Sequence, residues 1–484
     1  MCGESGAPFA GTLEIALSGD RYSPGPSFQS YNYGSKVLLV FGKLQLYGLE
    51  PSHAWTRLSN TAEAGDAEIV VQGAVDWQVG HTIVLASTSY EPSETETALI
   101  TAVRNVSAAN GAPATQLTLS NPLEFRHFAG VETHGGRSVS MRGEVGVLSR
   151  TISLRGTDAD EAPQFRSLHI GETGAQLIVS ELLEYTGGTY AEEVGEAHIV
   201  GVRVAQAGVQ GYSRRPAIGF HRLGKRPVGR NVLRSCVVEN SFNVGIHVLQ
   251  TGGLDISSNV VYNTIGSSFR LHSRGNTVYG NLGLRAATRL TYLGRETRST
   301  LTKVAWADYL GERLHESGSS SARHAGSRTA CCVCPPRLRL RWLCRSLAHV
   351  RRRSDATPSP LCTANAPLLA MLAANFEFDD TSPCAGCAVM NISANAAAGS
   401  ERLGFKFSGP APSECAGTSG GSVFASNTAH TNQLGFAVHF AQSAPCVEIR
   451  SLTLWRSWTM AVWGSVGTSP PCLHHPHPPS LSRL

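Results

Sequence analysis

Hydrophobic and polar residues alternate in short runs over the first 160 positions. Residues 13–17 alternate, and residues 37–40 form an apolar run. Alternation with a period of two places successive side chains on opposite faces of a strand. Further strand candidates follow at intervals of roughly 10–17 residues, separated by turn-forming residues: 68–71, 82–86, 98–103, 116–119 and 145–154. Because no stretch has the period of a long amphipathic helix, the pattern predicts an all-β chain.

The middle of the chain contains an internal repeat. The segment 237–241 recurs at 260–264, and 246–248 recurs at 269–271, both with an offset of 23 residues. A third, shortened copy spans 276–281. A period of about 22–23 residues is typical of one turn, or rung, of a right-handed parallel β-helix. We expect the recurrent asparagines to occupy tight corners and to form a hydrogen-bonded ladder between rungs.

The amino-acid composition agrees with a β-rich fold, and the distribution of charge argues against nucleic-acid binding. Of the 484 residues 50 are glycine, 42% are hydrophobic and 16% are charged, which fits a turn-rich globular protein and not a disordered one. The net charge of +5 invites a nucleic-acid-binding interpretation. However, fourteen Arg or Lys residues and only four acidic residues lie between Arg289 and Ser354. Because the positive charge is confined to this segment, we expect no nucleic-acid partner.

Neither end of the sequence has a recognisable targeting segment. Residues 1–19 lack the basic start and apolar run of a secretory signal peptide, and no window approaches the ~18 continuous apolar residues of a membrane span. The motifs along the chain nevertheless indicate an extracellular or cell-surface protein, attached to a membrane only through parts missing from this chain.

Seven motifs occur in a fixed order in the first 150 residues. They are Gly34 to Gly48, Trp55-Thr-Arg-Leu58, Val75-Asp-Trp-Gln-Val-Gly80, Ile83 to Tyr90, Glu94-Thr-Glu96, Pro122-Leu-Glu-Phe-Arg-His127 and Glu144-Val-Gly-Val-Leu-Ser-Arg150. In this order they resemble the fibrocystin family, in which an eight-glycine (G8) domain leads into a parallel β-helix. The same pattern occurs in related hyaluronan-binding proteins and hyaluronidases.

The resemblance and the repeat together predict a G8-type β-rich domain followed by a right-handed parallel β-helix of the pectin-lyase kind, with an irregular insert. The expected regions are the end of a G8 domain (1–50), a β-rich linking region (51–164), the β-helix (165–287), an Arg- and Cys-rich insert (288–370), later rungs (371–465) and a disordered tail (466–484).

The entry into the β-helix carries the candidate functional residues. Arg215-Pro-Ala-Ile-Gly-Phe-His221 resembles a family strand on which two histidines flank a phenylalanine in the hyaluronan-active members. Here Gly219 stands in place of the first histidine, so the resemblance implies binding without cleavage. His221 on a strand is also compatible with a purely structural role. Our candidates for a glycan-binding face are Arg150, Asp158, His221 and His247, and we predict no catalytic residue.

The family pattern lapses between about 286 and 370. Arg337-Leu-Arg-Leu-Arg-Trp342 and Cys331-Cys-Val-Cys334 suggest a nuclear signal or a zinc knuckle, but no Cys/His quartet has zinc-finger spacing. Only five of the 41 basic residues are lysine. This bias favours a retained intron or a shifted reading frame, and we expect the segment to be removable.

Later motifs return to the family pattern, among them Ser426-Asn-Thr-Ala-His430. Cys384-Ala-Gly-Cys387 is compatible with a redox pair or half a zinc site, although a disulfide-bonded loop fits a secreted protein better. Asn105 and Asn391 begin glycosylation sequons. We expect no metal site and no cofactor, with calcium left open as an alternative.

Three functions remain open from the sequence. The first is a non-enzymatic surface protein whose β-helix binds a polysaccharide or an extracellular protein. The second is a hyaluronidase-like enzyme that cleaves polysaccharide, and the third is a nucleic-acid binder. The missing histidine opposes the second, and the confined positive charge opposes the third. We therefore favour the first.

Overall fold

The computed structural model describes residues 2–20, 23–28, 31–134, 136–157, 173–186, 189–212, 214–287, 374–379, 390–408, 422–439 and 447–465. The chain divides into two units, residues 1–299 with 373–484 and residues 300–372, and the second unit lies outside the described residues. In the described part the secondary structure is β-strand, apart from the short 3₁₀ turn Pro92–Glu94. The predicted all-β class is confirmed.

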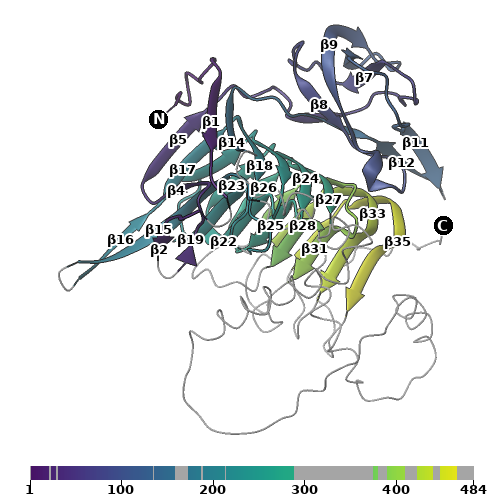
Figure 1. The fold of residues 1–484 in the computed structure, drawn as a ribbon. Helices are drawn as coiled ribbons and strands as arrows, with labels where there is room; N and C mark the ends of the chain where they lie inside the picture. The colour runs from purple at the N-terminus through teal and green to yellow at the C-terminus, as the bar shows by residue number, and fades with distance from the viewer. Residues whose placement is uncertain are drawn as a thin grey trace, which may run out of the picture. The chain divides into compact units, whose positions relative to one another are not determined.

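Most strands stack in three rows of parallel strands, which we call rows 1, 2 and 3 (Figure 1). Row 1 contains β1 (Leu13–Leu17), β14 (Ile152–Gly156), β18 (Val202–Ala207), β21 (Val237–Ser241), β24 (Val260–Ile265), β27 (Leu282–Ala287) and β30 (Ala396–Ala398). Row 2 contains β4 (Val37–Val40), β15 (Gln176–Thr186), β19 (Ile218–Lys225), β22 (Ile246–Gly252), β25 (Phe269–His272), β28 (Ala374–Asp379) and β31 (Leu403–Ser408).

Two long strands, β33 (Thr428–His439) and β35 (Thr453–Ser465), continue both row 1 and row 2. Row 3 contains β5 (Lys43–Tyr47), β17 (Glu196–Val200), β20 (Asn231–Arg234), β23 (Leu254–Ser257), β26 (Thr277–Tyr279), β29 (Asn391–Ser393), β32 (Ser422–Ala425) and β34 (Val447–Arg450). The chain visits one strand of each row before it begins the next rung, which is the predicted parallel β-helix.

The register confirms the predicted repeat. Val237 pairs with Val260 and Ile246 pairs with Phe269, so the offset of 23 residues is one rung. The β-helix also begins earlier than the sequence predicts. Strands β1, β4 and β5 pair in parallel with β14, β15 and β17, so that residues 13–47 form the first rung.

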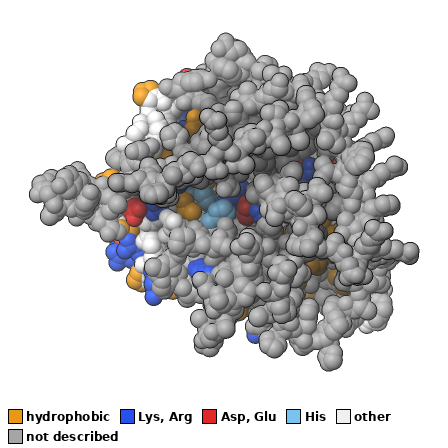
Figure 2. All heavy atoms as spheres, turned by 90° about the horizontal axis from the view of Figure 1, so that it is seen from below, with side chains coloured by type: hydrophobic (Ala, Val, Ile, Leu, Met, Phe, Trp, Pro, Cys, Tyr) orange, Lys and Arg blue, Asp and Glu red, His pale blue; other side chains and the backbone are white. Residues whose placement is uncertain are grey.

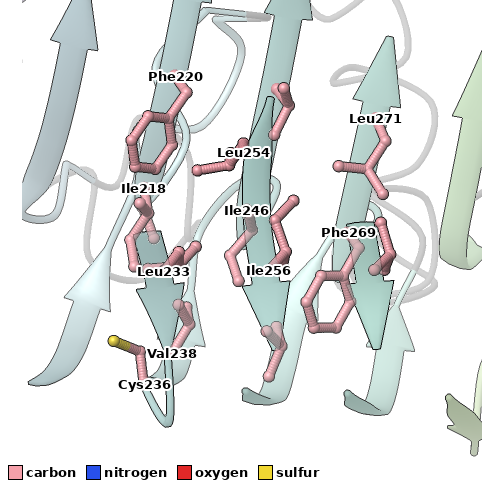
Figure 3. Packing of buried hydrophobic residues seen from close by; sticks show 14 of the residues in the cluster. Ile218, Phe220, Leu233, Cys236, Val238, Ile246, Leu254, Ile256, Phe269 and Leu271 are labelled. Carbon is pink, nitrogen blue, oxygen red and sulfur yellow. The ribbon is translucent and has the colours of Figure 1, made fainter. Parts of the chain in front are cut away.

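The core lies between the three rows, where large apolar side chains repeat from rung to rung (Figure 3). Phe269 stacks on Phe376 with ring centroids 4.5 Å apart, and Phe376 lies 5.1 Å from Phe405. All three side chains are fully buried. Burial of each such ring contributes about 2–3 kcal/mol, but only if the adjacent rung covers it. The rungs therefore stabilise one another.

Buried asparagines join successive rungs at the corner between rows 3 and 1. The main-chain N–H and side-chain Nδ2 of Asn259 both donate to Oδ1 of Asn281, at 3.0 and 2.9 Å. Asn281 donates in the same way to Asn395, and Asn395 to Asn427. The predicted ladder is thus present. Asn263 has the left-handed φ of 57° that was predicted, but it lies within β24 and not at a corner between rows.

A separate antiparallel sheet interrupts the β-helix after its first rung. It contains β6 (Trp55–Arg57), β7 (Glu68–Gln72), β8 (Thr82–Leu85), β9 (Glu96–Ser107), β10 (Pro113–Leu119) and β13 (Glu144–Val147). This inserted sheet has its own apolar core. Antiparallel hairpins are formed by β2 (Ser27–Phe28) with β3 (Tyr31–Asn32), β11 (Ala129–His134) with β12 (Arg137–Arg142), and β15 with β16 (Thr189–Val194).

A buried ionic contact joins the inserted sheet to the β-helix. Glu144 Oε2 lies 2.6 Å from His430 Nε2, and Glu144 Oε1 lies 3.2 Å from Arg57 Nε. Burial by itself would raise the pKa of Glu144, but the charges and hydrogen bonds of His430 and Arg57 lower that pKa to about 2. Trp55 adds a hydrogen bond from Nε1 to the carbonyl oxygen of Gly280, at 2.6 Å.

The asparagine ladder gives a first prediction. Replacement Asn281→Ala leaves the N–H of Asn259 and the carbonyl of Ile256 without their partners in a buried place. Each unsatisfied group costs about 1–3 kcal/mol, so we expect the free energy of unfolding to fall by about 2–5 kcal/mol in urea titrations. The exposed Asn391 is the matched control, and Asn391→Ala should cost less than about 0.5 kcal/mol. Equal losses in both variants would contradict a structural ladder.

The segment 288–373 gives a second prediction. This segment, which lies outside the described residues, connects β27 of row 1 to β28 of row 2. In the preceding rung the same connection, from β24 to β25, takes only residues 266–268. Because β27 and β28 pair with neighbours on both sides, their backbone hydrogen bonds do not require it. We expect a chain with 288–373 replaced by Gly-Ser-Ser to keep its far-ultraviolet circular dichroism and cooperative thermal unfolding. Loss of cooperative unfolding would show that the segment is part of the fold.

Candidate functional site

The outward face of row 2 carries a line of polar residues in register. Alternate residues of β19, β22 and β25 point into the core, as Ile218, Phe220, Ile246, Phe269 and Leu271 do in Figure 3. The residues between them face outward. One line across the strands contains Gly219, His247, Arg270, Glu377 and Lys406, and the next contains His221, Leu249 and His272. We call these two lines the row 2 strip.

Three histidines in the row 2 strip form a continuous contact. The ring centroids of His221 and His247 lie 5.0 Å apart, and those of His247 and His272 lie 5.6 Å apart. His221 and His247 are only 3% and 4% exposed. Nevertheless, in the part of the chain that the structure describes, Nε2 of His221 and both ring nitrogens of His247 have no hydrogen-bond partner. Buried polar atoms without a partner are rare and costly, and a ligand-binding or catalytic role is one of the explanations for them.

Gly219 explains how His221 is placed. A Cβ atom at position 219 would lie 2.8 Å from Nε2 of His221 and 2.9 Å from Cδ1 of Ile178, so the imidazole occupies the space that a side chain would need. Gly219 pairs with His247 of the next rung. The strand of His221 thus has glycine where the resemblance places a first histidine, as the sequence indicates, but the next rung supplies a second ring, that of His247.

A buried carboxylate continues the row 2 strip. Glu377 Oε2 accepts from Arg270 Nε and from Ser267 Oγ, both at 2.8 Å, and Oε1 lies 2.8 Å from Lys406 Nζ. Burial by itself would raise the pKa of Glu377, but the charges of Arg270 and Lys406, with a hydrogen bond from His272, hold it well below its usual range. In Figure 2 histidine side chains lie directly beside an acidic and a basic group on this face.

The protonation states follow from these surroundings. Burial, together with the charges of Arg214 and Arg222, lowers the pKa of His221 to about 3. Burial and the neighbouring His221 and His272 also lower the pKa of His247 well below its ordinary value. At neutral pH both imidazoles are therefore neutral, and each can donate one hydrogen bond and accept another. Glu377 is ionised and has no proton to donate.

The other predicted binding residues lie apart from this strip. Arg150 is half-buried, and its guanidinium donates to the carbonyl oxygens of Ser235, Val147 and Ser149. Asp158 lies outside the described residues. Asn105 and Asn391 are exposed on β9 and β29, so glycosylation at these sequons stays a prediction.

Four residues of the row 2 strip were not predicted from the sequence. The repeat that aligns residues 246–248 with 269–271 could have placed Arg270 beside His247 and indicated His272 one residue beyond the aligned segment. Glu377 and Lys406 had no such signal, because residues 288–373 interrupt the repeat. In the described part of the chain, no three His, Cys, Asp or Glu side chains are arranged to hold a metal ion. The expectation of no cofactor, with calcium as the alternative, stays a prediction.

Comparison with known proteins agrees with this architecture. A model of the G8 domain matches residues 1–59, and a model of the CEMIP β-helix matches residues 185–323. Residues 1–59 are therefore similar to a G8 domain and residues 185–323 to the CEMIP β-helix, and the chain is similar to fibrocystin-L. Mouse fibrocystin-L is 33% identical over 307 residues, which are 62% of this chain and 7% of that protein. Dog fibrocystin is 28% identical over 246 residues, 50% of this chain and 5% of that protein.

The G8 match coincides with the first rung, and the CEMIP match begins in row 2 just before β16 and includes His221, His247 and Arg270. Among solved structures, the catalytic domain of a GH87 α-1,3-glucanase aligns with 84% of this chain and 76% of its own, at 9% identity and a TM-score of 0.27. A likeness this distant supports no argument about activity. No helix among the described residues is long and apolar enough to cross a membrane.

The buried histidines give a prediction about pH. The unfolded chain takes up a proton on His221 near its ordinary pKa of 6.5, whereas the folded chain does so only near 3. The unfolded state therefore binds more protons between these values, and stability falls as the pH drops from 6.5 towards 3. We expect His221→Gln to reduce that fall, by up to about 1.4 kcal/mol per pH unit.

Urea titrations at pH 7, 6, 5 and 4 measure this effect. The exposed His53 provides the control, since His53→Gln should leave the pH dependence unchanged. Identical pH profiles for wild type and His221→Gln would show that the ring is not held neutral by burial.

Proposed function

We propose that the row 2 strip binds an extended polysaccharide without cleaving it, in a protein of the cell surface or extracellular space. The observation that carries the proposal is the unmet hydrogen-bonding capacity of His221 and His247, since three of their four ring nitrogens are buried without a partner. Sugar hydroxyl groups both donate and accept, so they match the two functions of a neutral imidazole.

The geometry of a β-helix suits such a ligand. Neighbouring rungs are about 4.8 Å apart, so side chains in register offer contacts at a regular spacing along a linear polymer. Arg270 and Lys406 carry two positive charges and Glu377 carries one negative charge, so this group has a net charge of about +1. A net positive charge favours an acidic polysaccharide over a neutral one. Because His221 and His247 are buried, a ligand reaches them only when this face opens.

The same groups do not supply general acid catalysis. Cleavage of a glycosidic bond by hydrolysis needs a group that gives a proton to the leaving oxygen. Glu377 is held ionised, and His221 and His247 are held neutral, so none of the three offers a proton between pH 4 and 8. The chain spans 7% of the length of the fibrocystin-L proteins that it matches. The absence of cleavage is therefore proposed for this chain only.

His247→Phe tests the proposal in the full chain. Phenylalanine keeps the approximate size of the ring and removes two buried nitrogens that have no partner. We expect an equal or higher free energy of unfolding and about tenfold weaker binding of fluorescent hyaluronan, an acidic probe, in polarisation titrations. Dextran, a neutral probe, should bind less tightly than hyaluronan to the wild type.

The control is His81→Phe, because His81 immediately precedes β8 of the inserted sheet and does not belong to the strip. Unchanged hyaluronan binding in His247→Phe would refute binding at this strip. Hyaluronan incubated with wild type at pH 4–8, with and without calcium, should keep its chain length in size-exclusion chromatography. Shortening that disappears in His221→Ala would establish the hyaluronidase-like alternative instead.

A further inference from the structure

A cleft lies where the inserted sheet meets the β-helix, and none of the residues that line it belongs to the row 2 strip. Its volume is about 520 Å³, within the range of small-ligand sites. One wall is the segment 50–57 that leads into the inserted sheet. The opposite side is the corner between rows 3 and 1, with Arg234 and Tyr279 at its edge.

One side of this cleft, which we call its floor, has small residues that repeat once per rung. It consists of corner residues from successive rungs, each with a small side chain and a φ between 54° and 62°: Ser235, Ser258, Gly280, Ala394 and Ser426. Because rungs repeat at about 4.8 Å, these five residues extend over roughly 19 Å. Such a floor accommodates a short linear chain, but by its shape alone it does not select one.

Tyr279 supplies the recognition element that the floor lacks. Its side chain is 54% exposed, which is unusual for a large aromatic residue on a strand. Its partners in register on the two adjacent rungs are Ser257 and Ser393. Both neighbours are small, so neither covers the exposed part of the ring with a large side chain. The C–H groups of a pyranose carry partial positive charge and pack well on the negative face of an aromatic ring.

The charged groups of the cleft are already neutralised. Arg234 makes two hydrogen bonds to Glu50, at 2.8 and 2.9 Å, and Ser235 Oγ donates to Glu50 at 2.9 Å. Arg57 is paired with Glu144. A carboxylate and a guanidinium held side by side can bind neighbouring hydroxyl groups, and their cancelled charge gives no advantage to an ionic ligand.

We infer that this cleft is a binding site for a neutral oligosaccharide, with Tyr279 stacking on one sugar ring and the Glu50–Arg234 pair binding hydroxyl groups further along. Arg234 and Tyr279 are two rungs apart in row 3, or roughly 10 Å, so one ligand contacts both. The site is independent of the row 2 strip and of its preference for an acidic polymer.

Fluorescence polarisation of the full chain with labelled cellohexaose, chitohexaose and maltohexaose tests the inference. At least one of these probes should bind, and Tyr279→Ala should weaken its Kd at least tenfold. Glu50→Gln should weaken it as well. The matched control is Tyr90→Ala, because Tyr90 is similarly exposed, at 57%, on the connection after β8, and this variant should bind like the wild type.

Several outcomes would overturn the inference. These are the absence of binding by all three probes, equal binding by wild type and Tyr279→Ala, or equal loss in Tyr90→Ala. A loss of binding in His247→Phe but not in Tyr279→Ala would assign the neutral sugars to the row 2 strip. Failure of hyaluronan binding at that strip, by contrast, would leave the cleft unaffected. Thermal unfolding followed by circular dichroism confirms that each variant is folded.

Discussion

Hydrogen bonds between successive rungs are the interaction on which this structure depends. Within the three rows of the described chain, the strand N–H and C=O groups of one rung pair with the rung before it and the rung after it. The asparagine ladder extends the same dependence into the corners, where Asn259, Asn281, Asn395 and Asn427 bond to one another in sequence. The stacked phenylalanines are buried only because this pairing holds the rungs together.

One register determines both faces of row 2. The pairing that stacks Phe269 on Phe376 inside the β-helix also sets Arg270 beside Glu377 on the outside. Successive side chains of a strand point to opposite faces, so the core and the strip cannot be aligned independently. The order of the polar residues along the strip is thus set by the same register as the core beneath them.

The two proposed sites differ in how their polar groups are satisfied. In the row 2 strip the nitrogens of His221 and His247 remain without partners, which costs stability unless a ligand or an opening of this face satisfies them. In the cleft the carboxylate of Glu50 and the guanidinium of Arg234 already bond to each other without a ligand. The group that we propose to contact a sugar ring there is the exposed side chain of Tyr279. The first proposed site therefore carries a cost in folding stability, whereas the second does not.

The sequence by itself determined the all-β class, the rung of 22–23 residues and the use of asparagine at the corners. These features are local or periodic, and they appear in the alternation of residues 13–17 and in the offset between Val237 and Val260. The tertiary structure decided which distant residues meet. Glu377 joins Arg270 across the interrupted repeat, and Glu144 meets His430 although 286 positions separate them. It also showed that Gly219 makes room for His221, where the sequence suggested only a lost histidine. The physical reason is that pairing between rungs, and not distance along the chain, decides which residues become neighbours. A long connection between two rungs costs little more entropy than a short one. Contacts such as these therefore produce no recognisable pattern in the local sequence.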